Sequence, residues 1–195
     1  MKNLEIYIHI PFCVRKCEYC DFLSFPADDE AKLRYVKGLM AEMIFYGPLM
    51  KNYQVSSVYI GGGTPSSIDE LWIAALMEGV FDCFSVLPDA EISIECNPGT
   101  LSREKLLAYR DAGINRLSIG LQSANNDELK RLGRIHTFEQ FVTNYELARN
   151  VGFKNINVDL MYGLPGQSAS QYMATVNKII RLHPDHISAY SLIVE

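Results

Sequence analysis

The sequence predicts an α/β protein in which parallel strands form a partial, six-stranded (β/α)6 TIM-like barrel. Strand-like and helix-like segments alternate along all 195 residues, and glycine-rich or polar motifs follow the strand ends. Strands that alternate with helices imply right-handed crossovers and therefore a parallel sheet. A flat, doubly wound sheet is the competing arrangement, and a closed barrel would need about two further strand–helix units.

The first half of the chain contains three expected strands, over residues 4–10, 57–60 and 91–95. A helix is expected over residues 28–50, where apolar residues recur at helical spacing. The next helix is expected to begin at Ser67, which forms a capping-box pattern with Glu70. A third helix is expected over residues 102–112, with Gly113 as a left-handed cap.

The second half contains three further expected strands, over residues 116–120, 155–160 and 186–193. Two helical pieces lie between the first two of these strands. The second piece opens with a capping-box pattern from Thr137 to Gln140, and the helix before the last strand opens with the same pattern from Ser168 to Gln171. The last strand has no covering helix before Glu195, so we expect an unfinished unit that continues in further protein.

Length and composition indicate one globular core domain over residues 1–195. Apolar residues make up 48% of the chain and charged residues 21%, with a formal net charge of −5. No run of Lys or Arg exceeds two residues, which argues against a nucleic-acid surface. The sequence shows no signal peptide and no apolar stretch that could span a bilayer, so we expect a cytoplasmic protein.

Three of the five cysteines, Cys13, Cys17 and Cys20, follow the first strand in a C-x3-C-x2-C pattern. In a cytosolic chain this crowding favours a metal centre over disulfides. Three thiolates suit a 4Fe-4S cluster in which one iron stays open for a chelating ligand. A zinc site with His9 or Asp21 as fourth ligand and a redox dithiol are the alternatives.

The other cysteines and the histidines are expected to be structural. Cys83 and Cys96 fit the pattern of small buried residues. The histidines are dispersed, which favours hydrogen-bonded structural roles over haem or metal ligation; they are His9, His136, His183 and His186.

Polar side chains end three successive strands: Glu95, Gln122 and Asp159. Each one alone could bond a neighbouring helix N-terminus, but three together at one sheet edge indicate a binding site. Carboxylates and amides suit ribose hydroxyls and an ammonium group, and Arg134 suits a carboxylate. Residues 61–64 read Gly-Gly-Gly-Thr, which lets backbone approach a ligand closely and does not match a dinucleotide fingerprint.

The chain resembles radical S-adenosylmethionine (SAM) proteins, in particular the group around oxygen-independent coproporphyrinogen III oxidase and the radical SAM haem chaperone. The resemblance begins at I-Y-I-H-I-P-F before the cysteine motif and continues in order through nearly the whole chain. The further matching segments are G-G-G-T-P (61–65), I-S-I-E-C-N-P (92–98), L-S-I-G-L-Q-S (117–123), L-G-R-I-H (132–136) and V-D-L-M-Y-G-L-P (158–165).

This resemblance implies a 4Fe-4S cluster on the three cysteines, with SAM beside it. The positions that match the family's SAM-binding residues are Tyr7, Tyr19, Gly62, Gly63, Thr64, Glu95, Gln122, Arg134 and Asp159. Within this set we expect Asp159 and Gln122 at the ribose, Arg134 at the methionine carboxylate and Glu95 at its ammonium group. The implied chemistry is one-electron cleavage of SAM to methionine and a 5′-deoxyadenosyl radical, which the cofactor supplies and the barrel orients.

Two functions of this group are the main hypotheses. The first is a haem chaperone that binds haem and delivers it to haem proteins, and the second is oxidative decarboxylation of coproporphyrinogen III without oxygen. The oxidase pattern has a further cysteine two residues after the third, where this chain has Phe22, so the chaperone is favoured. Another radical SAM activity, such as methylthiolation, is a third hypothesis.

The resemblance also implies partners and a missing part. The partners are haem or a porphyrin, haem-acceptor proteins and an electron donor such as flavodoxin or ferredoxin. Members of the group are longer and carry a carboxyl-terminal domain over the barrel mouth, which has no counterpart in this sequence. With that side uncovered, we expect poor solubility or association.

Overall fold

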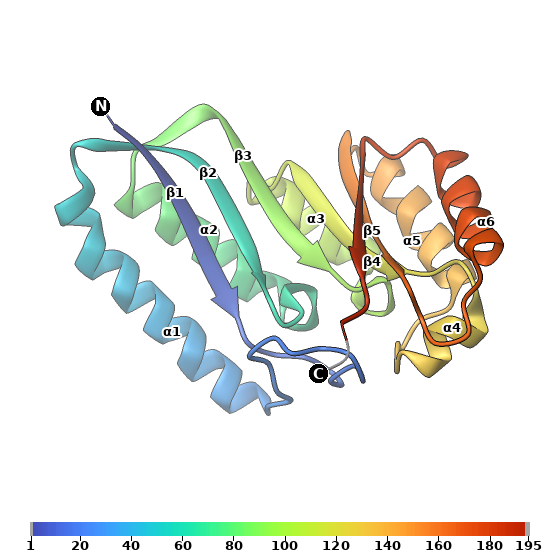
Figure 1. Ribbon diagram of the computed structural model, residues 1–195. Helices are drawn as coiled ribbons and strands as arrows, with labels where there is room; N and C mark the ends of the chain where they lie inside the picture. The colour runs from blue at the N-terminus through green and yellow to red at the C-terminus, as the bar shows by residue number, and fades with distance from the viewer. Residues whose placement is uncertain (1, 194–195) are drawn as a thin grey trace.

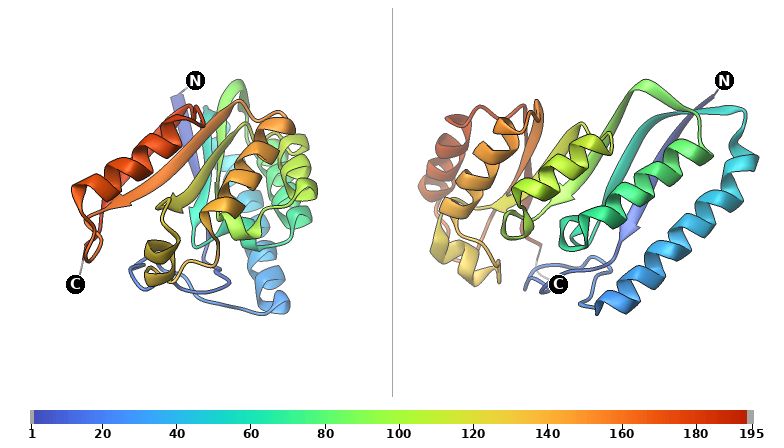
Figure 2. Two further views of the ribbon diagram at one scale, coloured as in Figure 1. Left: turned by 90° about the vertical axis from the view of Figure 1, so that its right-hand side faces the viewer. Right: turned by 180° about the vertical axis from the view of Figure 1, so that it is seen from behind.

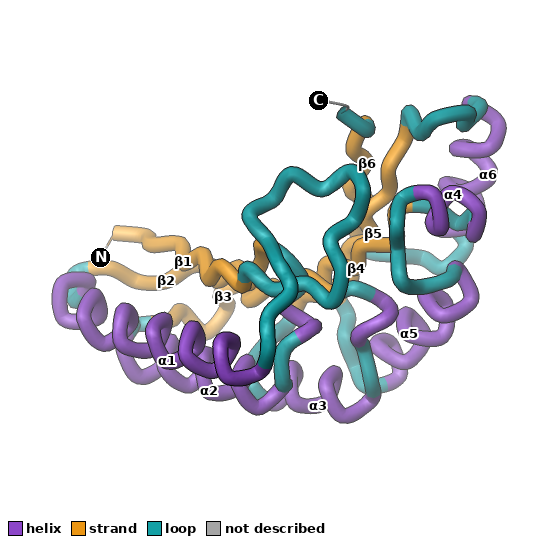
Figure 3. Tube along the Cα trace, turned by 90° about the horizontal axis from the view of Figure 1, so that it is seen from below, coloured by secondary structure: helices purple, strands orange, loops and turns teal. Residues whose placement is uncertain are grey.

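The computed structural model describes residues 2–193 and contains one sheet of six parallel strands in sequential order. The strands are β1 (Lys2–Ile10), β2 (Tyr53–Gly62), β3 (Val86–Cys96), β4 (Arg116–Gln122), β5 (Asn155–Tyr162) and β6 (His186–Ser191). A doubly wound sheet would reverse its strand order, so the sequential order excludes that arrangement. Figure 3 shows the strands as a curved layer with the helices outside it, which confirms the open half-barrel.

Helices cover one face of this sheet, as the front and rear views show (Figures 1 and 2). They are α1 (Asp29–Tyr46), α2 (Glu70–Cys83), α3 (Arg103–Asp111), α4 (Asn126–Arg131), α5 (Phe138–Asn150) and α6 (Ala169–Ile180), with short 3-10 helices at Gly47–Met50, Pro65–Ser67 and Pro98–Thr100. The predicted capping boxes at Thr137 and Ser168 begin α5 and α6. No helix within residues 2–193 is long and apolar enough to cross a membrane.

Two predicted helix boundaries are wrong. The start of α2 is capped by Asp69, whose carboxylate accepts from Leu71 N, because Ser67 is drawn into the preceding 3-10 helix. The Ser67 hydroxyl donates instead to the Phe12 carbonyl oxygen at 3.3 Å. The first helix loses its α geometry at Gly47, which begins a 3-10 helix that has Pro48 in its first turn.

Four further local predictions need correction, whereas one at Gly113 is confirmed. The second and third strands begin earlier than their apolar runs, and the sixth ends at Ser191 rather than at Ile193. Cys96 is buried as expected, but Cys83 is only half-buried because it ends α2 at the surface of the helix layer. Gly113 has a φ of 87° after α3, which confirms the predicted left-handed position.

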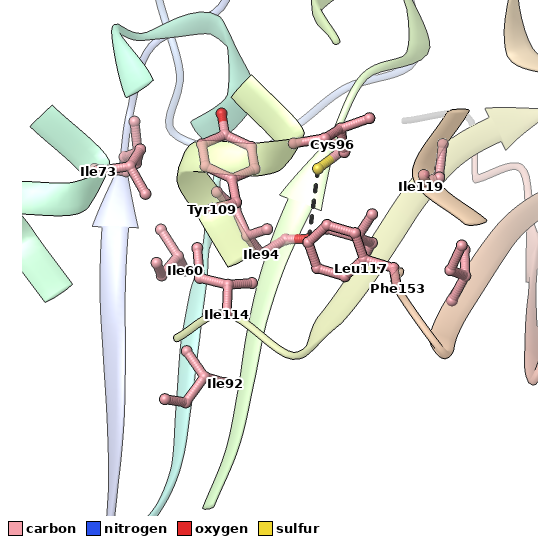
Figure 4. Close-up of a cluster of buried hydrophobic side chains, with 14 of the residues drawn as sticks. Ile60, Ile73, Ile92, Ile94, Cys96, Tyr109, Ile114, Leu117, Ile119 and Phe153 are labelled. Carbon is pink, nitrogen blue, oxygen red and sulfur yellow. Dashed lines mark hydrogen bonds between the residues drawn. The ribbon is translucent and has the colours of Figure 1, made fainter. Parts of the chain in front are cut away.

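The face of the sheet toward the helices is a continuous apolar core (Figure 4). Successive strand residues point to opposite faces, so each strand contributes every second residue to this core. Ile60, Ile94, Leu117 and Val158 are fully buried there, and Ile73 of α2 packs with the same cluster. Burial of each such side chain contributes about 1.5–3 kcal/mol, which makes this layer the main source of stability.

The concave face carries polar side chains at the alternate strand positions. Neighbours in register on this face include Tyr59 with Ser93, Glu95 with Ser118, and Gly120 with Asp159. A cavity of about 590 Å³ opens there, lined by Tyr59, Glu91, Arg116, Asn155, Asp185 and His186. A closed barrel fills its interior with branched apolar side chains, so this face differs from a packed barrel core.

Candidate functional site

The loop between β1 and α1 carries the three cysteines beyond the carboxyl ends of the strands, at the bottom of Figure 1. Backbone bonds from Cys13 N to Phe25 O (3.2 Å) and from Phe25 N to Pro11 O (2.9 Å) hold its two halves together. A bond of 3.3 Å from Glu18 N to Leu132 O ties its middle to the segment after α4. The loop therefore reaches from the first strand to the residues that follow the fourth.

Two of the cysteines contact residues that were predicted to share their site. The Cys13 Sγ lies 3.4 Å from the Thr64 Oγ1, and the Arg134 Nη1 lies 3.6 Å from the Cys17 Sγ. All three, Cys20 included, are free and half-buried. Cysteine binds iron as the thiolate, so a cluster on this loop would place the positive Arg134 guanidinium beside the sulfur of Cys17.

Two glycines bring the end of β2 against this loop. Gly62 has a φ of 116°, and a Cβ there would lie 2.6 Å from the His9 ring. A Cβ on Gly63 would lie 2.8 Å from the Phe12 carbonyl oxygen and 3.1 Å from the Cys13 Sγ. A larger residue at Gly63 would collide with the cysteine loop, whereas one at Gly62 would collide with His9 near the end of β1.

Glu95, near the end of β3, is held by two donors. The Tyr59 hydroxyl donates to its Oε1 at 2.8 Å, and the Gly62 N–H donates to its Oε2 at 3.1 Å. Burial raises the pKa of this carboxyl, while the two hydrogen bonds oppose the increase. Tyr7, which was predicted to contact SAM, stacks its ring on Tyr59 with centroids 6.2 Å apart. Since 58% of the residue is exposed, Tyr7 lies at the margin of this group.

Arg134 connects the cysteine loop to β4. Its Nη2 donates to the Gly120 carbonyl oxygen at 2.5 Å, and its Nη1 donates to the Tyr19 hydroxyl at 3.4 Å. Burial raises the pKa of Tyr19 to about 12, so this hydroxyl stays protonated. The Arg134 Nε is buried and has no hydrogen-bond partner among the described residues, which suits a carboxylate ligand.

Gln122 and Asp159 lie beside Gly120 at the same edge. Asp159 is the register partner of Gly120, whereas Gln122 follows a register shift and has a positive φ of 74°. A Cβ on Gly120 would lie 3.1 Å from the Gln122 Nε2 and 3.3 Å from the Arg134 Nη2, so these two groups share the space over the glycine. Burial raises the pKa of the Asp159 carboxyl against the effect of its own hydrogen bonds.

The chemistry of these groups is compatible with a four-iron cluster and a chelated ligand. Within residues 2–193, no three His, Cys, Asp or Glu side chains form a site for one ion. A four-iron cube takes its thiolates on different irons, so the cysteines need only surround it. The Gln122 Oε1, buried and unpaired in this part of the chain, and the Arg134 Nε supply an acceptor and a donor for a ligand beside Cys17.

Three of the histidines have structural partners, as expected. His9 Nε2 lies 3.2 Å from the Leu23 carbonyl oxygen, and His136 Nε2 lies 3.3 Å from that of Leu121. His186 Nδ1 lies 2.6 Å from Asn157 Oδ1.

Sequence reasoning missed three residues that support the site: Tyr59, Ser118 and Asn157. Tyr59 binds Glu95, while Ser118 and Asn157 both bind Asp159. Asn157 lies two residues before Asp159 on one strand, so the period-two alternation of a strand was a signal for it. The other two depend on pairing between strands, which no single segment reveals.

The fold is a half-barrel, and its carboxyl edge carries a three-cysteine loop beside an arginine and buried carboxylates. These features define a class of β/α protein that can hold an iron–sulfur cluster and a small polar cofactor. The family model for the radical SAM superfamily matches residues 7–179, so the chain belongs to this superfamily. Membership implies a 4Fe-4S cluster and SAM as cofactors.

Similar proteins refine this assignment. The heme chaperone HemW of Escherichia coli (strain K12) is 40% identical over 198 residues, covering 98% of this chain and 51% of the relative. HemW of Bacillus subtilis (strain 168) is 40% identical over 190 residues, covering 97% and 50%. The solved coproporphyrinogen III oxidase HemN of Escherichia coli superposes with a TM-score of 0.91 at 32% identity, covering 98% of this chain and 44% of that one. The chain spans about half the length of the curated relatives it matches.

Proposed function

We propose that this protein binds a 4Fe-4S cluster on its three loop cysteines, binds SAM beside the cluster, and handles haem as a haem chaperone. The observation that carries the proposal is the convergence of Arg134, Thr64 and the strand-end polar residues on the cysteine loop. The 40% identity to heme chaperones over nearly the whole chain supports the haem part. Phe22, where the oxidase pattern has a cysteine, favours the chaperone.

Different residues bind different parts of the SAM molecule. The Arg134 Nε, which has no hydrogen-bond partner within residues 2–193, receives the methionine carboxylate, and Glu95 receives the ammonium group. Asp159 and Gln122 receive the ribose hydroxyls, and Tyr19 packs near the adenine. When bound and reduced, the cluster supplies the electron that cleaves the sulfonium bond. The protein side chains orient the cofactor and exclude water, and no acid–base pair is required for that step.

Anaerobic reconstitution with iron and sulfide, followed by EPR with and without SAM, tests the cluster and the open iron. We expect a reduced-cluster signal that changes when SAM is added. Cys17→Ser should abolish the signal, whereas Cys83→Ser, a matched change outside the loop, should retain it. An EPR signal of the parent protein that does not change when SAM is added would contradict the proposal.

Titration with hemin tests the haem part separately. A saturable optical change is expected for the reconstituted protein, and its absence would overturn the chaperone assignment. The oxidase is the second candidate because of the TM-score of 0.91 to HemN. Turnover of coproporphyrinogen III under anaerobic, reducing conditions would favour it.

The proposal includes partners and a location. Haem-acceptor proteins receive the haem, and flavodoxin or ferredoxin supplies the electron. The cytoplasm suits an exposed cluster loop with free cysteines, because thiols remain reduced there.

A further inference from the structure

The side chain of Asn157 is the centre of a hydrogen-bond network on the concave face. Asn157 is 2% exposed. Its Nδ2 donates to the Asp159 Oδ1 at 2.7 Å and to the Ser118 Oγ at 2.9 Å. Its Oδ1 accepts from the Ser188 Oγ at 3.0 Å and lies 2.6 Å from the His186 Nδ1. The amide therefore uses both of its donors and both acceptor positions.

The chemistry of Asp159 fixes the direction of every bond in this network. An ionised carboxylate only accepts hydrogen bonds, so the Asn157 Nδ2 must face it and the Oδ1 must face the opposite way. The His186 Nδ1 then has to carry a proton in order to bond to that oxygen. Ser118 completes the set, because its hydroxyl donates to the Asp159 Oδ2 at 3.2 Å. Both carboxylate oxygens of Asp159 thus accept hydrogen bonds from residues that precede the carboxyl ends of the strands.

We propose that Asn157 is a positioning residue that holds the Asp159 carboxylate ready to bind SAM, and that His186 holds the Asn157 amide in turn. This inference rests on the proposed function, because it takes Asp159 as a SAM contact. His186 lines the cavity of about 590 Å³ on the concave face, so the network runs from that cavity to the cofactor site.

Asp159 needs a hydrogen-bond donor such as Asn157 because its carboxyl group is buried. Burial raises the pKa of this carboxyl, and the hydrogen bond from Asn157 opposes that increase. Without the Asn157 donor, the carboxyl is more easily protonated and free to rotate. A protonated carboxyl loses an acceptor position, so it binds ribose hydroxyls less well.

The dissociation constant of SAM, measured on reconstituted protein at pH 7.5, tests the first part. Asn157→Asp keeps the shape but replaces the donor with a carboxylate, and we expect SAM affinity to fall by about tenfold or more. Asn155→Asp is the matched control, since it adds the same charge to the same face two residues away from Asn157. We expect it to change affinity by less than about twofold. Asn157→Ala is a second variant in case the aspartate variant folds poorly.

Cluster content and Tm are measured alongside, because a merely structural role would lower them together with affinity. Loss of affinity at parental cluster content and Tm supports positioning. Parental affinity in both Asn157 variants would overturn it, and so would an equal loss in Asn155→Asp. If the parent protein itself does not bind SAM, the proposed function fails instead, so the two failures are distinguishable.

A pair of substitutions at His186 tests the second part. In His186→Asn the amide nitrogen takes the place of the ring Nδ1 and can still donate to Asn157, whereas His186→Ala removes the donor. We expect His186→Ala to weaken SAM binding by about threefold to tenfold, and His186→Asn to restore most of it. Equal affinity in the two variants would exclude a role for this bond.

Discussion

The two faces of the sheet are built from the same strands but differ in chemistry. Leu117 and Val158 point toward the helices and are fully buried in the apolar core. Their next neighbours along the chain, Ser118 and Asp159, point into the concave side and bond to each other. The comparison indicates that the helix-covered face supplies the stability, whereas the concave face supplies the polar groups of the site.

Substitution of neighbouring residues on one strand is the strongest way to test this division. Leu117→Ala should reduce the free energy of unfolding by about 2–5 kcal/mol, because it leaves a cavity in the core. Ser118→Ala on the opposite face should cost only about 1 kcal/mol through lost hydrogen bonds. Chemical denaturation measures both values. An equal loss in the two variants would mean that the concave face is also structural core.

The next largest effect is expected at His136, a polar group buried beneath the carboxyl edge. Burial lowers its pKa to about 3, so the unfolded chain binds a proton there more readily than the folded protein. Its contribution to stability is fully present above the ordinary value of 6.5 and declines as the pH falls toward 3. Between pH 6.5 and 5 we expect a loss of about 2 kcal/mol.

His136→Gln isolates this effect, because Gln retains a donor for the Leu121 carbonyl oxygen without titrating. Denaturation at several pH values should then show a flatter acid limb than the parent. An unchanged slope would place the acid sensitivity in other groups.

Asp159→Asn tests whether a residue of the concave face contributes to SAM binding rather than to stability. Burial raises the pKa of Asp159, so its contribution to stability is present below its ordinary value of 3.8 and is lost as the pH rises through the raised value. At pH 7 the amide should leave stability unchanged or raise it by up to about 1 kcal/mol. SAM affinity should fall about tenfold in the same variant. Reduced stability with parental SAM binding would contradict the assignment of this face to binding.

The smallest effect is expected at the exposed edge of that face. Tyr7→Phe removes a hydroxyl that bonds only the Nδ1 of the half-buried His9, at 3.1 Å, among the described residues. Stability should change by less than about 0.5 kcal/mol, and SAM affinity by about twofold. Thermal denaturation and SAM titration measure the two quantities, and a large loss of stability would show that Tyr7 belongs to the core.

The sequence was sufficient for the order of the elements and for the carboxyl edge of the site. Alternating segments and capping patterns such as Thr137 with Gln140 are local, so they could be identified without the fold. The start of α2 was missed because a 3-10 turn competes with the capping pattern at Ser67. The Arg134–Cys17 contact joins residues 117 positions apart, so only the folded chain brings the two side chains together.

Strand register explains what remained unpredicted. Tyr59 reaches Glu95, and Asn157 reaches Ser118, only because neighbouring strands pair in one particular register. The single-strand pattern indicates which face a residue occupies, but not its neighbour on the next strand.

The irregularity at the end of β4 determines where the Gln122 side chain lies. Gln122 leaves the regular ladder through a register shift and a left-handed backbone conformation, which is costly for a residue with a side chain. Because of that conformation, the Gln122 amide does not follow the alternation of side chains between the two faces that the earlier residues of β4 follow. Exchange of this one side chain would therefore change the polar group that lies beside Arg134 over Gly120, while the strand pairing beneath it is preserved.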